Sequence, residues 1–338
     1  MNDRAVALLE QYDIEVLRTR KGRGAILCDT SDGCLIFKEY TGNEDRLKMQ
    51  DKLLHRIEEA GEVYAELLIP TKEGKLSVKD TDGSTYILKT YREGCECNIY
   101  DKAECISAVK LLAKLHGCAE YTPETAEMPE LFSPAKEYEK RNRELKRVRK
   151  YLTQRGQKSW FEICLLNTYN LFLEQALSVT EEWNEYCRLY GNDNSSVKIN
   201  IPAYTYCHGD YQYHNIIKSG GEWFLINFEK CQPDDGIRDL YLLMRKLLEK
   251  SNWSVSLGRE LLKGYSDERP ISAVGFIDLY YRLAYPEKFW KIVNFYYNSR
   301  KTWIPDRNGE KLDKLINQET QKQQFLNEVF RDVEVLRK

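Results

Sequence analysis

The stretch CHGDYQYHNIIKSGGEWFLINFEK, residues 207–230, carries the clearest chemical signal in the chain. It places Asp210 and Asn215 in the pattern D-x4-N. In phosphoryl transfer, an enzyme holds a hydroxyl nucleophile in line with the γ-phosphate and neutralises the phosphate charge with metal. An aspartate on a rigid loop can accept the hydroxyl proton, and an asparagine five residues later can give its amide oxygen to Mg²⁺. The spacing therefore predicts a catalytic loop with Asp210 as base.

A second metal-binding group should follow on a strand pair. The apolar segment 223–226 supplies a strand, and Asn227, Phe228 and Glu229 come directly after it. The string H-G-D alone is a weak signal, and Asp210 with Asn215 alone would suit an ordinary turn. The loop, the strand and the polar-Phe-acid triplet in this order are specific for phosphotransfer.

The N-terminal part of the chain adds a candidate phosphate ligand. Lys38 lies inside the predicted strand 34–40, where alternation places it on the same face as Cys34 and Ile36. A phosphate-binding role explains a lysine in that position. The preceding turn KGRGA, residues 21–25, contains Gly22 and Gly24 and could lay backbone N–H groups over phosphates. An ordinary hairpin turn explains this segment equally well.

The chain is organised as a small strand-rich part followed by a larger helical part. Two Asp-Gly pairs, at residues 32–33 and 82–83, mark hairpins. The pattern predicts strands at 13–20, 25–30, 34–40, 74–80 and 84–92, a helix at 44–60, helices at 102–117, 135–152 and 159–190, strands with tight turns over 204–229, and helices from 237 onward. We expect an α+β, two-lobed protein-kinase-like fold, with a nucleotide-binding lobe at 1–92, a hinge at 93–98 and a helical lobe at 99–338.

Composition excludes several classes of function. The 338 residues contain 51 Lys and Arg against 53 Asp and Glu, a net charge of −2, so no charge bias favours nucleic acid or a membrane surface. No apolar run approaches the roughly 20 residues that span a bilayer. The polar N-terminus lacks the features of a signal peptide, and the ten cysteines show no zinc-binding spacing. These observations predict a cytoplasmic protein.

Four segments make the chain resemble a known family: CHGDYQYHNII at 207–217, INFEKCQPDDGIRDLYLLMRK at 226–246, LLAKLHG at 111–117 and LAYPEKFWKIVNFYYNSRKTW at 283–303. The chain resembles the aminoglycoside phosphotransferase/choline kinase-like superfamily and, within it, the CotS family of spore coat proteins. The likeness covers essentially the whole chain. It implies assembly into the spore coat during sporulation.

The resemblance also implies roles for single residues. Asp210 would be the catalytic base, His208 a scaffold residue of its loop, and Asp239 a brace reaching that loop from the following helix. Lys38 would hold the nucleotide phosphates. The segment 89–94 would be the hinge whose backbone meets adenine, which makes Thr90 and Arg92 candidate cofactor-binding residues. The helix carboxylate that pairs with Lys38 stays open among Asp51, Glu58 and Glu59.

The metal site departs from the family pattern. Asn215 would bind Mg²⁺ and Glu229 matches the second acid, but Asn227 stands where the family has its principal Mg²⁺-binding aspartate. Asparagine offers one neutral oxygen in place of two charged ones, and the loss could cost several kcal/mol of transition-state stabilisation. Glu229 lies two residues further along a strand-end turn, which is a different position from that of the missing aspartate.

These inferences support three hypotheses. The first is a CotS-like, spore coat-associated kinase-fold protein that uses ATP and Mg²⁺, with impaired or specialised phosphotransfer to a hydroxyl-bearing substrate. The second is an active kinase of a small sugar or amino alcohol. The third is a pseudokinase scaffold that binds coat proteins and no nucleotide. An intact pair between Lys38 and a carboxylate, together with an open adenine slot, would favour the first two. A slot filled by side chains would favour the third.

Overall fold

The computed structural model describes residues 7–22, 24–121, 134–190, 204–298, 306–331 and 333. The chain forms two compact units. Unit one comprises Met1–Met128, Ala203–Leu243 and Gly264–Arg269, and unit two comprises Pro129–Pro202, Met244–Lys263 and Pro270–Lys338. Two helices, α6 (Ile237–Lys250) and α7 (Val255–Glu268), contribute residues to both.

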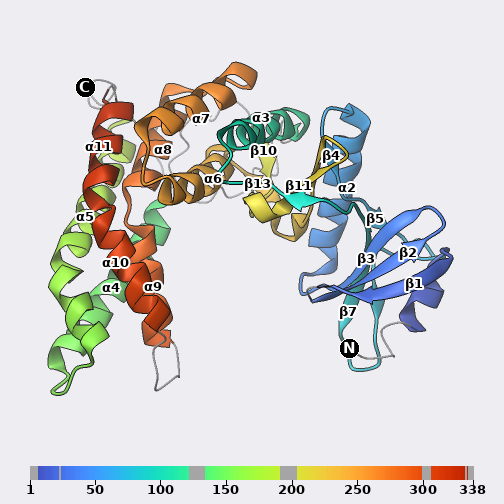
Figure 1. Cartoon of the computed structure of the whole chain (residues 1–338), viewed down its shortest axis with the longest axis horizontal. Helices are drawn as coiled ribbons and strands as arrows, with labels where there is room; N and C mark the ends of the chain where they lie inside the picture. The colour runs from blue at the N-terminus through green and yellow to red at the C-terminus, as the bar shows by residue number, and fades with distance from the viewer. Residues whose placement is uncertain are drawn as a thin grey trace. The chain divides into compact units, whose positions relative to one another are not determined.

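Unit one contains an antiparallel sheet whose strands lie side by side in Figure 1. Its order is β1-β2-β3-β7-β5, with β6 also paired to β7. The strands are β1 (Val16–Lys21), β2 (Ala25–Thr30), β3 (Gly33–Glu39), β5 (Leu68–Ile69), β6 (Val78–Lys79) and β7 (Thr85–Tyr91). Glycines with positive φ close both hairpins: Gly24 (71°) between β1 and β2, and Gly33 (130°) between β2 and β3.

Apolar residues on one face of this sheet form a core with the 3-10 helix η1 (Leu8–Gln11). Phe37 of β3 is 1% exposed and stacks on Tyr86, with the edge of Tyr12 against it. Alternation along β3 leaves Lys38 facing away from Phe37. The core therefore fixes the direction in which Lys38 points.

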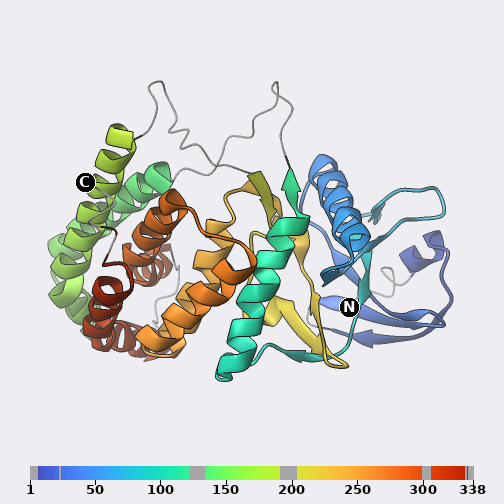
Figure 2. The same cartoon turned by 90° about the horizontal axis from the view of Figure 1, so that it is seen from above.

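Helix α2 (Glu44–Ala60) follows β3, with the bounds that the sequence predicted. Asn43 caps its N-terminus by accepting a hydrogen bond from the backbone N–H of Arg46, and Gly61 ends it in the left-handed conformation at φ 69°. Its apolar face is buried through Leu47, Leu53, Leu54 and Ile57. Figure 2 shows α2 beside the strands of the same unit.

The rest of unit one carries the predicted catalytic loop. Strands β11 (Ile216–Ser219) and β12 (Glu222–Leu225) form a hairpin, flanked by β8 (Cys95–Glu96) and β4 (Tyr64–Ala65). Strand β10 (Tyr204–Cys207) lies between β9 (Glu120–Tyr121) and β13 (Gln232–Asp234), beside helix α3 (Lys102–Cys118). The loop after β10 leads into the 3-10 helix η2 (Tyr213–Asn215), and η3 (Phe228–Lys230) follows β12.

Unit two is helical. It contains α4 (Pro134–Gln154), α5 (Trp160–Tyr190), α8 (Ala273–Ala284), α9 (Glu287–Asn298), α10 (Asp306–Asn317) and α11 (Glu319–Val329). Helices α4 and α5 pack along each other, as both cartoon views show. Arg141 of α4 lies 2.5 Å from the Glu287 carboxylate of α9, and the ring of Tyr138 stacks on that of Tyr285, so an ion pair and an aromatic contact accompany the apolar packing.

The predicted α+β class is confirmed: a strand-rich N-terminal part with one helix precedes a mainly helical C-terminal part. Some details differ. The expected strand 74–80 is reduced to the two residues of β6. Strands β4, β5, β8, β9 and β13 were not expected, because strands of two or three residues carry no periodic signal. The lobe boundaries at 1–92, 93–98 and 99–338 stay a prediction.

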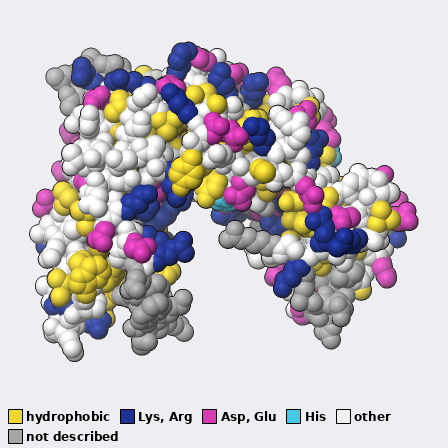
Figure 3. Space-filling view, in the orientation of Figure 1, with side chains coloured by type: hydrophobic (Ala, Val, Ile, Leu, Met, Phe, Trp, Pro, Cys, Tyr) yellow, Lys and Arg dark blue, Asp and Glu magenta, His cyan; other side chains and the backbone are white. Residues whose placement is uncertain are grey.

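On the face shown in Figure 3, basic and acidic groups lie interspersed, as the net charge of −2 leads one to expect. Among the described helices, none has both the length and the apolar character needed to cross a membrane.

Candidate phosphoryl-transfer site

The loop after β10 is held by one carboxylate of α6. Asp239 is fully buried, and its two oxygens accept the backbone N–H groups of His208, at 2.6 Å, and Gly209, at 3.0 Å. Gly209 has φ 77°, and a Cβ there would collide with the backbone carbonyl of Lys230. Asp239 thus makes the bracing contact that the family resemblance implied.

Asp210 stands at the end of this braced loop with both carboxylate oxygens engaged. Lys230 Nζ lies 2.8 Å from its Oδ2, and Gln212 Nε2 donates to its Oδ1. Burial raises the pKa of Asp210, but the hydrogen bonds from Lys230 and Gln212 outweigh it and lower the pKa below the ordinary value. The predicted base is therefore ionised and already bound to two donors.

The side chains of the two asparagines predicted as metal ligands are hydrogen-bonded to each other. Asn227 Nδ2 donates to Asn215 Oδ1 at 2.8 Å, and Lys38 Nζ donates to Asn227 Oδ1 at 3.2 Å. Asn215 Nδ2 in turn donates to the backbone carbonyl of Asp210 at 2.8 Å. A chain of hydrogen bonds thus runs from Lys38 to the catalytic loop. Asn227 has φ 68°, a left-handed conformation that asparagine tolerates well.

Lys38 has a carboxylate partner, and it is Glu229. Lys38 Nζ lies 2.9 Å from Glu229 Oε1. Asp51, Glu58 and Glu59 of α2, the three alternatives from the sequence, make no ion pair with Lys38. Those expectations were wrong because the pairing comes from the triplet after β12 and not from the helix.

A second lysine, Lys89 of β7, shares the same carboxylate. Its Nζ lies 2.7 Å from Glu229 Oε1 and 2.8 Å from Glu66 Oε2, and its side chain is 1% exposed. Burial raises the pKa of Glu229, but Lys89 and Lys38 outweigh this and hold it at about 2. Burial lowers the pKa of Lys89, but the negative charges of Glu66 and Glu229 raise it by more, so the pKa lies above its ordinary value. Glu229 and Lys89 are therefore both charged at neutral pH.

Glu66 fixes the backbone of the triplet. Its carboxylate is buried and accepts the N–H of Asn227 at 2.8 Å and of Phe228 at 3.0 Å, in addition to its ion pair with Lys89. Sequence reasoning missed Glu66 and Lys230, and noted Lys89 only as the start of the hinge. Lys89 had the same signal as Lys38, a lysine inside an apolar strand.

Lys38 and the predicted catalytic and metal-binding residues line one cleft of about 760 Å³ in unit one, within the size range of small-molecule sites. Its walls combine acids, bases and aromatics. The lining residues are Lys38, Glu39, Tyr40, Thr41, Gly42, Arg46, Glu96, Asp210, Tyr213, His214, Asn215, Asn227, Glu229 and Lys230.

Four predicted cofactor-binding residues are not among the residues lining this cleft. Gly22 and Gly24 form the β1–β2 turn, where the Gly22 N–H bonds to the Ala25 carbonyl. The Thr90 hydroxyl accepts the Leu67 N–H within the sheet. Arg92 packs its guanidinium over the rings of Tyr64 and Phe224 and pairs with Glu222. Their nucleotide-binding roles stay predictions.

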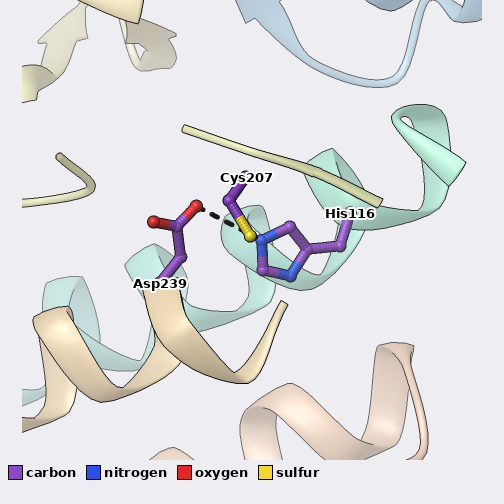
Figure 4. A group of neighbouring side chains, drawn as sticks. All are labelled: His116, Cys207 and Asp239. Atoms are coloured by element: carbon purple, nitrogen blue, oxygen red, sulfur yellow. Dashed lines mark ion pairs between the residues drawn. The ribbon is translucent and has the colours of Figure 1, made fainter. Parts of the chain in front are cut away.

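A buried group of three potential metal ligands lies behind the loop (Figure 4). His116, Cys207 and Asp239 each bring one ligand atom within 4.8 Å of the others. Their other contacts indicate a structural role: both Asp239 oxygens bind the loop backbone, and His116 Nδ1 lies 2.7 Å from the Tyr265 hydroxyl. The Cys207 thiol bonds to a backbone carbonyl 3.2 Å away, and burial raises its pKa well above the usual range.

The comparisons identify the family. Residues 5–329 match the family described as "Spore coat putative kinase YutH", and the chain belongs to that family. It is also 29% identical over 126 residues to spore coat protein S of Bacillus subtilis (strain 168). That match spans only about a third of either protein, 37% of this chain and 36% of the relative.

Solved structures define the fold. An aminoglycoside phosphotransferase from Alicyclobacillus acidocaldarius superposes with a TM-score of 0.83 at 18% identity, covering 98% of this chain and 96% of that one. A spectinomycin phosphotransferase, solved with ADP and spectinomycin, gives a TM-score of 0.62 at 14% identity over 93% and 92% of the chains. The predicted kinase-like fold is thus confirmed, and this is a kinase-like protein of a spore coat family.

Proposed function

We propose that this protein is a spore coat-associated kinase-fold protein that binds ATP in the cleft beside Lys38 and transfers its phosphate poorly. The observation that carries the proposal is that the candidate catalytic groups are bound to one another. Asp210 is bound to Lys230 and Gln212, Asn215 to Asn227, and Glu229 to two lysines.

Nucleotide binding is supported by the Lys38–Glu229 pair. A lysine held by a carboxylate inside a kinase-like cleft is positioned to meet phosphate oxygens. The pair favours a nucleotide-binding protein over a scaffold without nucleotide. Fold analogy adds that a structural neighbour was solved with ADP.

Impaired transfer is supported by the state of Asp210. A general base must present an oxygen to the hydroxyl whose proton it accepts. In Asp210, Oδ2 contacts the Lys230 ammonium and Oδ1 the Gln212 amide, so an acceptor hydroxyl must displace one of these donors. Asn227 adds to the effect because it brings no negative charge to the phosphate-binding region.

Association with the coat is supported by family membership. The substrate, if one exists, would be a hydroxyl-bearing small molecule lodged beside Asp210.

Two measurements on the full-length protein test the proposal. Calorimetric titration with ATP should show saturable binding, and an ADP-release assay with a panel of sugars and amino alcohols should show turnover far below typical kinase rates of roughly 1–100 s⁻¹. Turnover in that range with any acceptor would establish an active small-molecule kinase instead. Absence of ATP binding under all conditions would leave the scaffold hypothesis.

A further inference from the structure

Three basic side chains line the candidate cleft, each from a different element. Lys38 comes from β3, Arg46 from the first turn of α2, and Lys230 from η3. Lys230 is 64% exposed at its side chain and contacts the Asp210 carboxylate. Across the described ranges, the Arg46 guanidinium makes no ion pair or hydrogen bond, and its backbone N–H binds the cap residue Asn43. The Arg46 charge is therefore available to an anion, whereas Lys38 and Lys230 would have to share or leave the carboxylates of Glu229 and Asp210.

The predicted metal ligands do not fit Mg²⁺. This ion prefers octahedral coordination by oxygens, with carboxylates supplying its charge compensation in proteins. Asn215 Oδ1 accepts from Asn227, Asn227 Oδ1 accepts from the Lys38 ammonium, and Glu229 Oε1 lies within 2.9 Å of two ammonium groups. A divalent cation here would break this network and sit beside Lys38, with two neutral amides and a carboxylate that is already paired with two lysines as ligands.

We propose that the cleft binds the nucleotide as the metal-free polyphosphate, with Lys38, Lys230 and Arg46 supplying the positive charge that a metal supplies in other kinases. The inference rests on the proposed ATP binding and specifies its form. Ammonium and guanidinium groups make short, charge-assisted hydrogen bonds to phosphate oxygens. The Asn215–Asn227 pair needs no metal, because each amide already has a partner.

Lys230 is the group that changes partner. Its flexible stem and exposed position allow the ammonium to leave Asp210 and meet a phosphate in the same cleft. A tri- or diphosphate carries more charge than the single carboxylate of Asp210 and competes for the lysine. Lys230 is therefore assigned as a phosphate ligand whose resting partner is Asp210. Once Lys230 has moved, Asp210 keeps the Gln212 amide on Oδ1 but has Oδ2 free, so impaired transfer in the nucleotide complex rests on the neutral Asn227.

The experiment is calorimetric titration of the full-length protein with ATP, first in EDTA and then in excess Mg²⁺ at matched ionic strength. The account expects an affinity in EDTA at least equal to that in Mg²⁺. Lys230→Met should weaken binding in EDTA by roughly tenfold or more, since it removes a charged hydrogen bond. Lys75→Met is the matched control: Lys75 is 70% exposed and lies 2.7 Å from Glu73, outside the cleft.

The outcomes separate this inference from the proposed function. ATP binding that requires Mg²⁺ would overturn the metal-free mode and leave ATP binding intact. Equal affinities of Lys230→Met and Lys75→Met in EDTA would overturn the assignment of Lys230. No binding in either buffer would overturn the proposed function, and this inference with it.

Discussion

The side-chain amide of Asn227 donates a hydrogen bond to Oδ1 of Asn215 across 2.8 Å. The two positions that the family resemblance assigns to metal binding are thus joined by a hydrogen bond between neutral amides. The Lys38 ammonium donates to the amide oxygen of Asn227. A carboxylate at position 227 would have no N–H to offer Asn215. Asn227 therefore stabilises the site in the absence of a metal ion. It does not supply the negative charge that binds the metal in phosphotransfer.

Replacing Asn227 by aspartate should create a metal requirement. Asn227→Asp places a carboxylate beside Asn215 Oδ1 and removes the donor between them, which gives Mg²⁺ a charged ligand. We expect Mg²⁺-dependent ATP turnover at least about tenfold above that of the wild type, equivalent to about 1.4 kcal/mol. ADP release in Mg²⁺ and in EDTA measures it.

Asn298→Asp is the control for that substitution, since Asn298 also donates its amide to an asparagine, Asn294, but on an exposed face of α9. It should match the wild type. Equal turnover in all three proteins would show that Asn227 does not limit the chemistry.

The Glu229 ion pairs should make stability depend on acidic pH. The folded-state pKa of Glu229 is about 2, below its ordinary 4.5, so the carboxylate stabilises the fold above about pH 4.5 and loses this effect as the pH falls toward 2. Glu229→Gln should lower stability at pH 7 by about 3 kcal/mol. The gap to the wild type should shrink steadily between pH 5 and pH 2 in urea unfolding. A gap that stays constant with pH would contradict the charged network.

Gly209 should tolerate no side chain. Its φ is 77°, and an added Cβ would meet the backbone carbonyl of Lys230. Gly220 offers a matched comparison, because its φ is 58° but its surroundings are open. Gly220→Ala should cost about 1 to 2 kcal/mol for the left-handed conformation alone. Gly209→Ala should cost clearly more, measured as the urea midpoint of unfolding, and similar losses would show that the close approach is unimportant.

Glu66 and Lys89 should behave as a coupled buried pair. Glu66→Gln leaves the Lys89 ammonium with less compensation and weakens the hold on the Asn227 and Phe228 amides, so we expect a loss of about 3 to 5 kcal/mol. The double variant Glu66→Gln, Lys89→Met should recover part of this loss, since no buried charge is left unpaired there. Additive losses in the double-mutant cycle would rule out the coupling.

Much of the candidate site was predictable, because turn motifs, strand alternation and short sequence spacings determine where its residues lie. Asp-Gly turns and alternating strands fix β2 and β3, which orient Lys38, and the catalytic loop brings Asp210 and Asn215 together through five residues of chain. Glu229 and Asn227 follow from the strand that precedes them. These residues do line one cleft.

The partners of these residues were not predictable, because they depend on packing between distant segments. Glu66 meets Asn227 across 161 residues of sequence, and Lys89 meets Glu229 across 140. Lys230 is one residue beyond the predicted triplet, yet nothing in the sequence shows that its ammonium reaches Asp210. The helix carboxylates Asp51, Glu58 and Glu59 were reasonable by spacing, but Glu229 supplies the charge instead.

The measurement that tests the central claim most directly is phosphorus NMR of ATP mixed with stoichiometric full-length protein and a panel of sugars and amino alcohols. The account predicts shifted or broadened ATP resonances that persist for hours, which would show a bound nucleotide whose γ-phosphate is not transferred. Rapid replacement of the γ-phosphate signal by those of ADP and a phosphorylated acceptor would contradict impaired transfer. ATP resonances identical to those of free ATP would contradict nucleotide binding itself.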